Sequence, residues 1–284
     1  MQTVIQILTG CALAGLLGAV GLRLTFGEVR SALRRCRFTA ILVANFVAIP
    51  AFSVVAVKLL GLSHHVAIAM ILLAAAPFAP VVPVFARMAR ADLALAAGLT
   101  AVYPLLSVVL TPLSAQGALW LLSHRELVRL NLLSSLGVLA ATITLPLAVG
   151  VFVRHRQPVL AQRLLRPMEI LSEATGAASL ALVTVTEFRS ITELGWRAWL
   201  AMAIGFELSL LVGWMLGGSA RGARQVVALG TSNRNIALAL LVALQNFAGS
   251  PVVSAVVGNG LLLIGMGLIH VGWWHFAQRC RSAS

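Results

Sequence analysis

Long apolar runs separated by short polar stretches follow one another along the whole chain. A helix that spans a bilayer needs about 20 mostly apolar residues. The first run lacks the basic start and the cleavage site of a signal peptide, so we expect it to be a mature span. The pattern predicts nine transmembrane helices, near residues 4–22, 38–60, 64–88, 92–120, 130–153, 168–187, 196–217, 222–246 and 251–276.

Two of these predicted spans carry residues that interrupt a helix. The third contains Pro77, Pro80 and Pro83, and each proline removes an amide donor and clashes with the preceding turn. The eighth contains the polar run 230–235, Gly-Thr-Ser-Asn-Arg-Asn, between two apolar segments. Irregular backbone at such depth is tolerated only where it is buried in protein or lines a cavity. We therefore predict two discontinuous helices. They lie five spans apart, as expected if two inverted five-helix units repeat and the first unit has lost its opening helix. Pairs of interrupted helices at matching positions of two repeats mark the binding site in many transporters.

The composition supports a single transmembrane domain over residues 1–284. The chain is 60% hydrophobic and only 10% charged, with a mean hydropathy of +0.98, whereas soluble domains carry about 25% charged residues. The net charge of +13 does not indicate nucleic-acid binding, because the basic residues lie in short loops rather than on one folded face. The lipid bilayer is the expected surrounding, and no nucleic-acid partner is expected.

The loop charges predict an orientation. With the N-terminus outside, fifteen of the 21 Lys and Arg residues fall on the inner side and five on the outer side, which leaves Arg234 inside a span. This bias is the positive-inside pattern and supports an odd number of spans. We expect a multi-pass protein of the plasma membrane (the cell inner membrane) with a cytoplasmic C-terminus. The five outer residues are Lys58, Arg125, Arg129, Arg189 and Arg197.

The polar run of the eighth span supplies the main candidate binding residues. An arginine near the bilayer centre costs at least about 2.5–3.5 kcal/mol on insertion scales and needs compensation. Arg234 either receives an anionic substrate or forms an ion pair with Glu207, which lies in the middle of the seventh span. The neighbouring hydroxyls and amides either bind a ligand or satisfy the freed backbone carbonyls. These candidates are Arg234, Asn233, Ser232, Thr231 and Asn235.

Other features are weaker indicators of function. Glu173 and Glu187 are expected towards the ends of the sixth span, where they reach water. The first span carries glycines at near-helical spacing, which suit either close helix packing or a homo-oligomer face. These glycines are Gly10, Gly15, Gly18 and Gly21.

Several segments occur in the order found in a known group of transporters. Residues 17–26 read Leu-Gly-Ala-Val-Gly-Leu-Arg-Leu-Thr-Phe and lead through an arginine-rich linker to Asn-Phe-Val-Ala-Ile-Pro at 45–50. Arg-Ala-Asp-Leu-Ala-Leu at 90–95 and Leu-Thr-Pro-Leu at 110–113 follow, and then the broken eighth span. This order resembles the bile acid:sodium symporter-like superfamily. The resemblance implies a panel and a core of helices, two crossing broken helices, alternating access, and transport of organic anions, often with sodium.

The sequence departs from that family where sodium would bind. The stretch 78–83 offers no side-chain oxygen in the first broken helix, and Ala228 stands where the resemblance implies an acidic residue. Tyr103 and Pro104 stand where it implies two hydroxyls. We therefore do not expect sodium coupling. Besides substrate binding and ion pairing with Glu207, Arg234 could then have a third role, in which its fixed positive charge replaces the coupling ion. The polar residues that remain are Asn45, Thr100, Ser232 and Asn233.

The function indicated by these observations is a secondary transporter or facilitator of a small organic anion. A proton could couple through Glu207. No nucleophile–base or acidic–metal constellation occurs in the predicted spans, so we expect neither an enzyme, nor a cofactor, nor a metal site. The alternative is a non-transporting membrane sensor or assembly subunit on a transporter fold, since loss of ion ligands can accompany loss of transport.

Overall fold

The structure, a computed structural model, describes residues 2–23, 25–122 and 130–282. Arg125 and Arg129, two of the predicted outer basic residues, lie outside the described residues. Every regular element within these ranges is helical, which confirms an all-α fold. In chain order the elements are α1 (Gln2–Arg23), α2 (Phe26–Arg34), α3 (Phe38–Val43), η1 (Ala44–Ala48), α4 (Ile49–Leu60), α5 (His64–Ala74), α6 (Val82–Met88), α7 (Leu93–Leu122), α8 (Leu132–Leu139), η2 (Ala140–Thr144), α9 (Leu145–Arg156), α10 (Pro158–Thr186), α11 (Phe188–Thr192), α12 (Trp196–Leu216), α13 (Arg221–Ser232), α14 (Ile236–Asn246) and α15 (Val252–Ser282).

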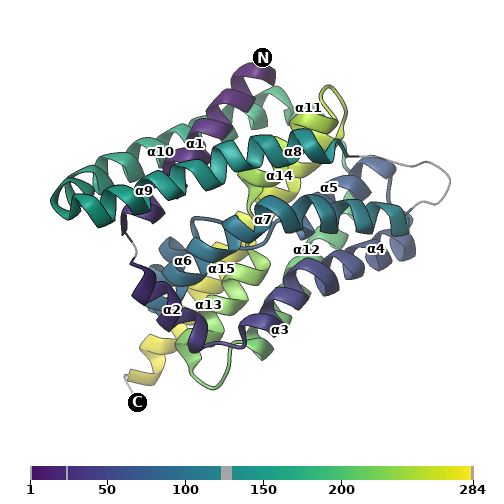
Figure 1. Cartoon of the computed structure of the whole chain (residues 1–284). Coiled ribbons are helices and arrows are strands. Elements are labelled where there is room, and N and C mark those ends of the chain that lie inside the picture. Colours follow the sequence, from purple (N-terminus) through teal and green to yellow (C-terminus); the bar gives the residue numbers. More distant parts are fainter. Residues whose placement is uncertain (1, 24, 123–129, 283–284) are drawn as a thin grey trace.

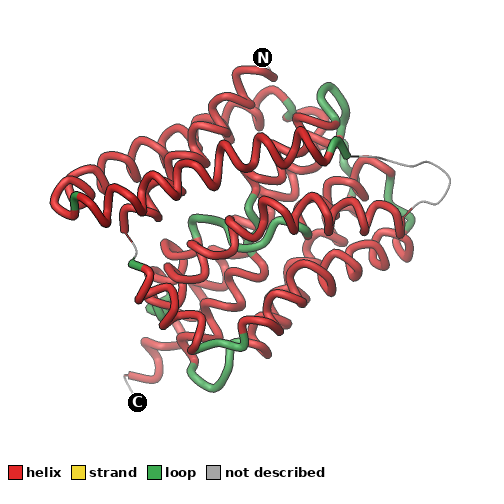
Figure 2. The backbone as a smooth tube through the Cα atoms, viewed as in Figure 1, coloured by secondary structure: helices red, strands yellow, loops and turns green. Residues whose placement is uncertain are grey.

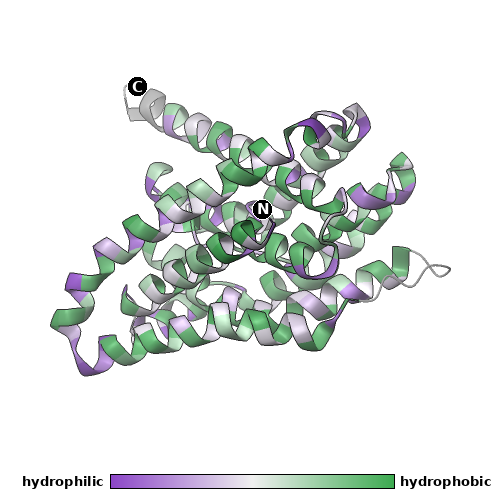
Figure 3. Ribbon diagram, turned by 90° about the horizontal axis from the view of Figure 1, so that it is seen from above, coloured by the Kyte–Doolittle hydropathy of each residue, from purple (hydrophilic) through white to green (hydrophobic). Residues whose placement is uncertain are grey.

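The nine predicted spans all correspond to helical regions. Within the described ranges, eight helical runs are long and apolar enough to cross a membrane, and the pair α5–α6 occupies the remaining predicted span. In Figure 1 the N-terminal end of α1 lies at the top of the view, and the C-terminal end of α15 lies at the bottom. Hydrophilic residues gather at turns and helix ends, whereas the helix bodies are mostly hydrophobic (Figure 3). One boundary was wrong: α10 begins at Pro158, not near residue 168.

The helices form two groups, which we call the panel and the core (Figure 1). The panel consists of α1, the run α8–η2–α9, and α10, and α1 packs along both α9 and α10. Gly15 and Gly18 of α1 face Ser172 and Met168 of α10, while Gly21 faces the backbone of α9. The glycine face of the first span therefore serves close packing within the panel.

The core contains the run α3–η1–α4, the broken pairs α5–α6 and α13–α14, and α7, α12 and α15. The run α13–α14 is the most enclosed of the eight long apolar helical runs. In its most apolar 18-residue stretch 89% of the residues are buried, whereas in that of α10 only 17% are. The polar residues of α13–α14 are therefore held inside the protein, and α10 faces outward along most of its length.

Two local features of the helices were not predicted. Residues 26–34 form the short helix α2, whose N-cap Thr25 and N3 residue Glu28 make a reciprocal capping box. The element is too short and too charged to register as a span. In addition, the π-helical segments η1 and η2 each end shortly before a proline, Pro50 or Pro146. A π-helical segment shifts the pattern of backbone hydrogen bonds near a proline, which has no amide proton to donate.

Candidate functional site

The two broken helices cross near the middle of the molecule (Figure 2). We call this region the crossing; it consists of residues 75–81, between α5 and α6, and residues 233–235, between α13 and α14. The amide of Phe78 donates to the carbonyl of Gly230 at 3.0 Å, and the amide of Asn235 donates to the carbonyl of Ala76 at 2.7 Å. Each break thus satisfies backbone groups that the other exposes.

These contacts confirm the prediction that both spans are interrupted. The break in the eighth span is shorter than expected, because Gly230, Thr231 and Ser232 still belong to α13. The three prolines of the third span act as predicted: Pro77 and Pro80 lie in the irregular segment, and Pro83 lies in the first turn of α6, where a missing amide costs little.

The backbone at Phe78 takes an uncommon conformation that fits the crossing tightly. Its φ is +56°, in the left-handed region, which is costly for a bulky residue. The ring stacks on buried Tyr103 with centroids 4.1 Å apart. Its other neighbour is Gly230, where a Cβ atom would overlap the ring. A glycine at position 230 is therefore required for the two breaks to approach each other.

Arg234 is buried on the side of the crossing that faces the core. Only 4% of the residue is exposed, and its Nη1 donates to Asn45 Oδ1 at 3.0 Å and to the carbonyl of Ala74 at 3.1 Å. Ala74 is the last residue of α5, and α13 ends two residues before Arg234. A helix C-terminus carries roughly half a negative charge. The end of α5 therefore places a partial negative charge at Nη1, whereas Nη2 is buried without a hydrogen-bond partner among the described residues.

Three of the predicted candidate residues meet in one hydrogen-bonded chain. Asn45 accepts from Arg234, and its Nδ2 donates to the carbonyl of Ile41 at 2.9 Å and to Thr231 Oγ1 at 3.3 Å. Ser232 donates to the carbonyl of Ala228 at 2.9 Å, so its hydroxyl satisfies its own helix. Asn45 thereby ties η1 to α13 and to Arg234, and Arg234 in turn bonds to the end of α5.

Two candidate residues are not brought to the crossing. The predicted ion pair between Glu207 and Arg234 is wrong: Glu207 Oε2 lies 3.3 Å from His270 Nε2, on the face of α12 that meets α15. The Glu207 side chain is 47% exposed, whereas Arg234 is buried. Thr100 donates to the carbonyl of Ala96 in its own helix at 2.8 Å and lines neither cavity described below.

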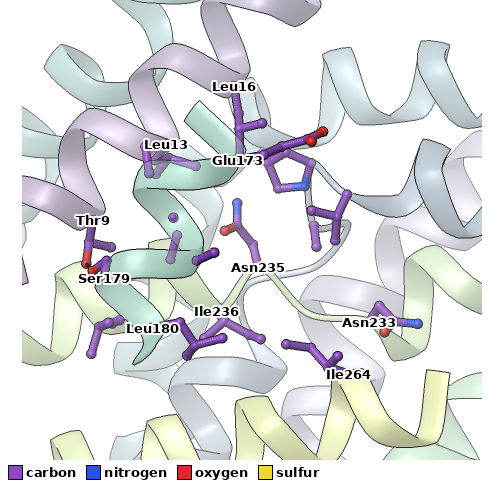
Figure 4. Close-up of a pocket in the computed structure, with 18 of the residues that line it drawn as sticks. Thr9, Leu13, Leu16, Glu173, Ser179, Leu180, Asn233, Asn235, Ile236 and Ile264 are labelled. Carbon is purple, nitrogen blue, oxygen red and sulfur yellow. Dashed lines mark hydrogen bonds between the residues drawn. The ribbon is translucent and has the colours of Figure 1, made fainter. Parts of the chain in front are cut away.

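A cavity of about 290 Å³ lies between the panel and the crossing, and we call it the main cavity. Panel helices α1 and α10 form one side, and residues 79–81 and 233–237 with parts of α14 and α15 form the other. Figure 4 shows Asn235 and Glu173 among the side chains that line this cavity. Its walls are mainly apolar. The hydroxyls of Thr9 and Ser179, 2.7 Å apart, hydrogen-bond to each other.

A second, much smaller cavity of about 30 Å³ lies on the core side of Arg234. Ser53, Ser209, Ser232 and Asn259 contribute its polar lining. This volume admits a water-sized group but no organic molecule. Of these two cavities, only the main cavity has room for an organic molecule, and Arg234 lines both.

A panel, a core and two broken helices that cross beside a cavity are the arrangement that the family resemblance implied. Residues 11–194 match the family model of the sodium bile acid symporter family. The chain belongs to this family. It is thus a multi-pass membrane transporter of the bile acid and organic anion type. The match includes the first broken helix of the symporter fold, and Arg234 lies beyond it. None of the curated proteins compared with the chain matches it.

Sequence reasoning missed the contribution of the panel to the site of this symporter family member. Glu173 was expected near a helix end, where it reaches water. It is exposed, but α10 extends from residue 158 to residue 186, so Glu173 lies in the middle of that helix and also lines the main cavity. Thr9 and Ser179 gave no signal, because single hydroxyls in apolar helices usually bond to their own backbone. Only the packing of α1 on α10 places them beside the crossing.

Proposed function

We propose that this protein is a secondary transporter or facilitator of a small organic anion that works by alternating access without sodium coupling. The observation that carries the proposal is the position of Arg234. Its guanidinium takes the Asn45 amide oxygen and the carbonyl at the end of α5, at 3.0 and 3.1 Å. In transporters with broken helices, unwound carbonyls and helix C-termini are the groups that hold coupling cations.

A fixed guanidinium at this position disfavours a sodium ion for two reasons. It uses oxygens that the ion would need, and it places a like charge beside the ion in a medium of low dielectric, where repulsion is strong. The stretch 78–83 adds no side-chain oxygen, and Ala228 adds no carboxylate. Arg234 therefore acts as a built-in cation that stabilises the crossing permanently.

The anionic group of the substrate binds at the other side of the crossing. Helix α14 begins at Ile236, and its first residues line the main cavity. The first-turn amides of Ile236 and Ala237 have no acceptor within the helix, and a helix N-terminus favours negative charge. Asn233 and Asn235 lie on the same wall, so they are the proposed direct contacts, while Arg234, Asn45, Thr231 and Ser232 support them from behind.

Alternating access would arise from movement of the panel against the core. The main cavity is bounded by both groups, so a relative shift exposes it to one side of the membrane or the other. The loop charges favour an N-terminus outside, a cytoplasmic C-terminus and a location in the cell inner membrane.

A role of Glu207 in proton coupling stays a prediction, now with His270 as its partner instead of Arg234. Intramembrane titratable pairs often belong to proton relays. Glu207→Gln is expected to change the pH dependence of uptake into proteoliposomes. The matched control is Glu193→Gln, on the exposed α11–α12 turn. An unchanged profile would remove Glu207 from coupling.

The decisive functional experiment is counterflow of labelled organic acids in sodium-free proteoliposomes. Saturable exchange is expected, because the ligand enters a cavity that two movable helix groups share. Ligand binding without exchange would instead support the alternative of a sensor or assembly subunit. Exchange only in the presence of sodium would contradict the role given to Arg234.

A further inference from the structure

One charged side chain in the main cavity is not explained by anion transport alone. Glu173 of α10 lines this cavity, and no hydrogen bond or ion pair to it occurs within the described part of the chain. The other charged residue of the lining, Arg234, directs its guanidinium towards Asn45 and Ala74. A ligand in the main cavity therefore meets a carboxylate on the panel side.

The basic residues near Glu173 do not neutralise its negative charge inside the main cavity. An adjoining rim pocket, which shares Glu173 with the main cavity, is lined by Arg23, Arg87, Glu169 and Glu173. Glu169 already pairs with Arg23 within the panel. Arg87, on core helix α6, lines the rim pocket but not the main cavity. Glu173 is thus the member of this group that reaches the ligand space.

The opposite wall offers donors. Asn235 is 1% exposed, its Oδ1 accepts from the amide of Leu238 at 3.1 Å, and its Nδ2 has no partner among the residues that the structure describes. A buried amide donor without a partner costs free energy, so a ligand acceptor there is favoured. The first-turn amides of α14 lie beside it. The core wall therefore presents donors, and the panel wall presents an acceptor.

The remaining lining limits the body of the ligand. Leu13, Leu16, Leu180 and Ile264 provide an apolar surface between the two polar walls. The volume of about 290 Å³ is at the small end of the range for ligand pockets, which runs from about 300 to 1,000 Å³. A compact apolar body with polar groups at two ends fits this space.

We infer that the substrate is a small amphipathic zwitterion, an organic acid that also carries a protonated amine. Its carboxylate meets Asn235 and the start of α14, and its ammonium group meets Glu173. This inference rests on the proposed function and specifies its substrate class. A plain carboxylic acid would leave Glu173 unpaired and add a like charge, whereas an ammonium group forms a charge-assisted hydrogen bond with it.

The test uses three compounds that share one apolar body. Phenylalanine carries both charged groups, 3-phenylpropionate lacks the amine, and phenethylamine lacks the carboxylate. Their affinities are measured without sodium, by thermal stabilisation of the purified full-length protein in lipid nanodiscs. Phenylalanine is expected to bind on the order of tenfold more tightly than either partial analogue, as one charge-assisted contact provides.

Glu173→Gln should abolish the preference of phenylalanine over 3-phenylpropionate while the protein keeps its unliganded melting temperature. The control is Arg87→Gln, which alters the adjoining rim pocket and should leave the preference intact. Equal affinities in the wild type, tighter binding of 3-phenylpropionate, or no stabilisation by any of the three would overturn the inference. Tighter binding of 3-phenylpropionate would still agree with anion transport, so the two proposals fail separately.

Discussion

At the scale of single residues, the crossing depends on a few tightly packed residues whose replacement would disturb it. Phe78 adopts a positive φ, and its ring fills the space between Tyr103 and Gly230. Arg234 depends on Asn45 and on one carbonyl at a helix end. These residues lie far apart in the sequence, and the fold makes them neighbours.

Gly230→Ala is expected to destabilise the protein by about 1–3 kcal/mol, because the new methyl group would force the Phe78 ring or the backbone to move. Gly117→Ala is the control, since a Cβ atom at Gly117 meets nothing within 4 Å. Both changes replace glycine by alanine within a helix. Equal melting temperatures in detergent for the two variants would contradict the tight fit at the crossing.

The sequence identified several of these residues, but not their partners. Arg234 and the polar run around it are conspicuous inside an apolar span, and Asn45 was a candidate as well. The partner of Arg234 could not be predicted, because Glu207 has a suitable charge and depth but lies on the face of α12 that meets α15. Glu173 was placed near a helix end, because the start of α10 was set too late.

At the scale of elements, both breaks and all nine helical regions followed from local rules. Prolines and polar runs in apolar spans are strong signals, since lipid offers no partner for a freed backbone group. Helix α2 was missed because its role depends on its position between the panel and the core, where it packs against α7. The π-segments were missed because proline alone does not specify them.

The capping box of α2 predicts a pH-dependent stability. Glu28 accepts from the Thr25 amide at 2.8 Å and from its hydroxyl, chiefly the former, and these bonds hold the pKa of Glu28 below its ordinary value of 4.5. The stabilisation is therefore complete above about pH 4.5 and is lost as the pH falls through the lowered pKa.

Glu28→Gln should accordingly lower the melting temperature at pH 7 and converge with the wild type in more acidic buffer. Thr25→Ala removes the other half of the box and is expected to cost about 0.5–2 kcal/mol at pH 7. A difference between Glu28→Gln and the wild type that is constant from pH 7 to pH 3 would show that the charge of Glu28 does not contribute.

At the scale of the whole molecule, hydropathy predicted the number of passes, and the order of segments pointed to the family. Neither could give the division into a panel and a core in atomic terms, because this division depends on which helix faces meet. The tight approach of α1 to α9 and α10, through glycines, is visible only once these helices are packed.

Alternating access predicts that the main cavity opens to both sides of the membrane in turn. A cysteine at Ala177, which lines the cavity, should react with a membrane-impermeant maleimide applied from either face. The neighbouring Ala178 is exposed but lines neither cavity, so a cysteine there should react slowly from both faces. The background has Cys11, Cys36 and Cys280 replaced by serine. Labelling of position 177 from one face only would contradict alternation.

The claim on which the functional account depends is that the guanidinium of Arg234 occupies the place of a coupling cation. The most direct measurement is ligand-induced thermal stabilisation across a panel of small organic acids, with sodium and with sodium replaced by choline. The expected result is stabilisation that does not depend on sodium, that disappears in Arg234→Ala and that is partly kept in Arg234→Lys. Stabilisation of the wild type that requires sodium would contradict the claim.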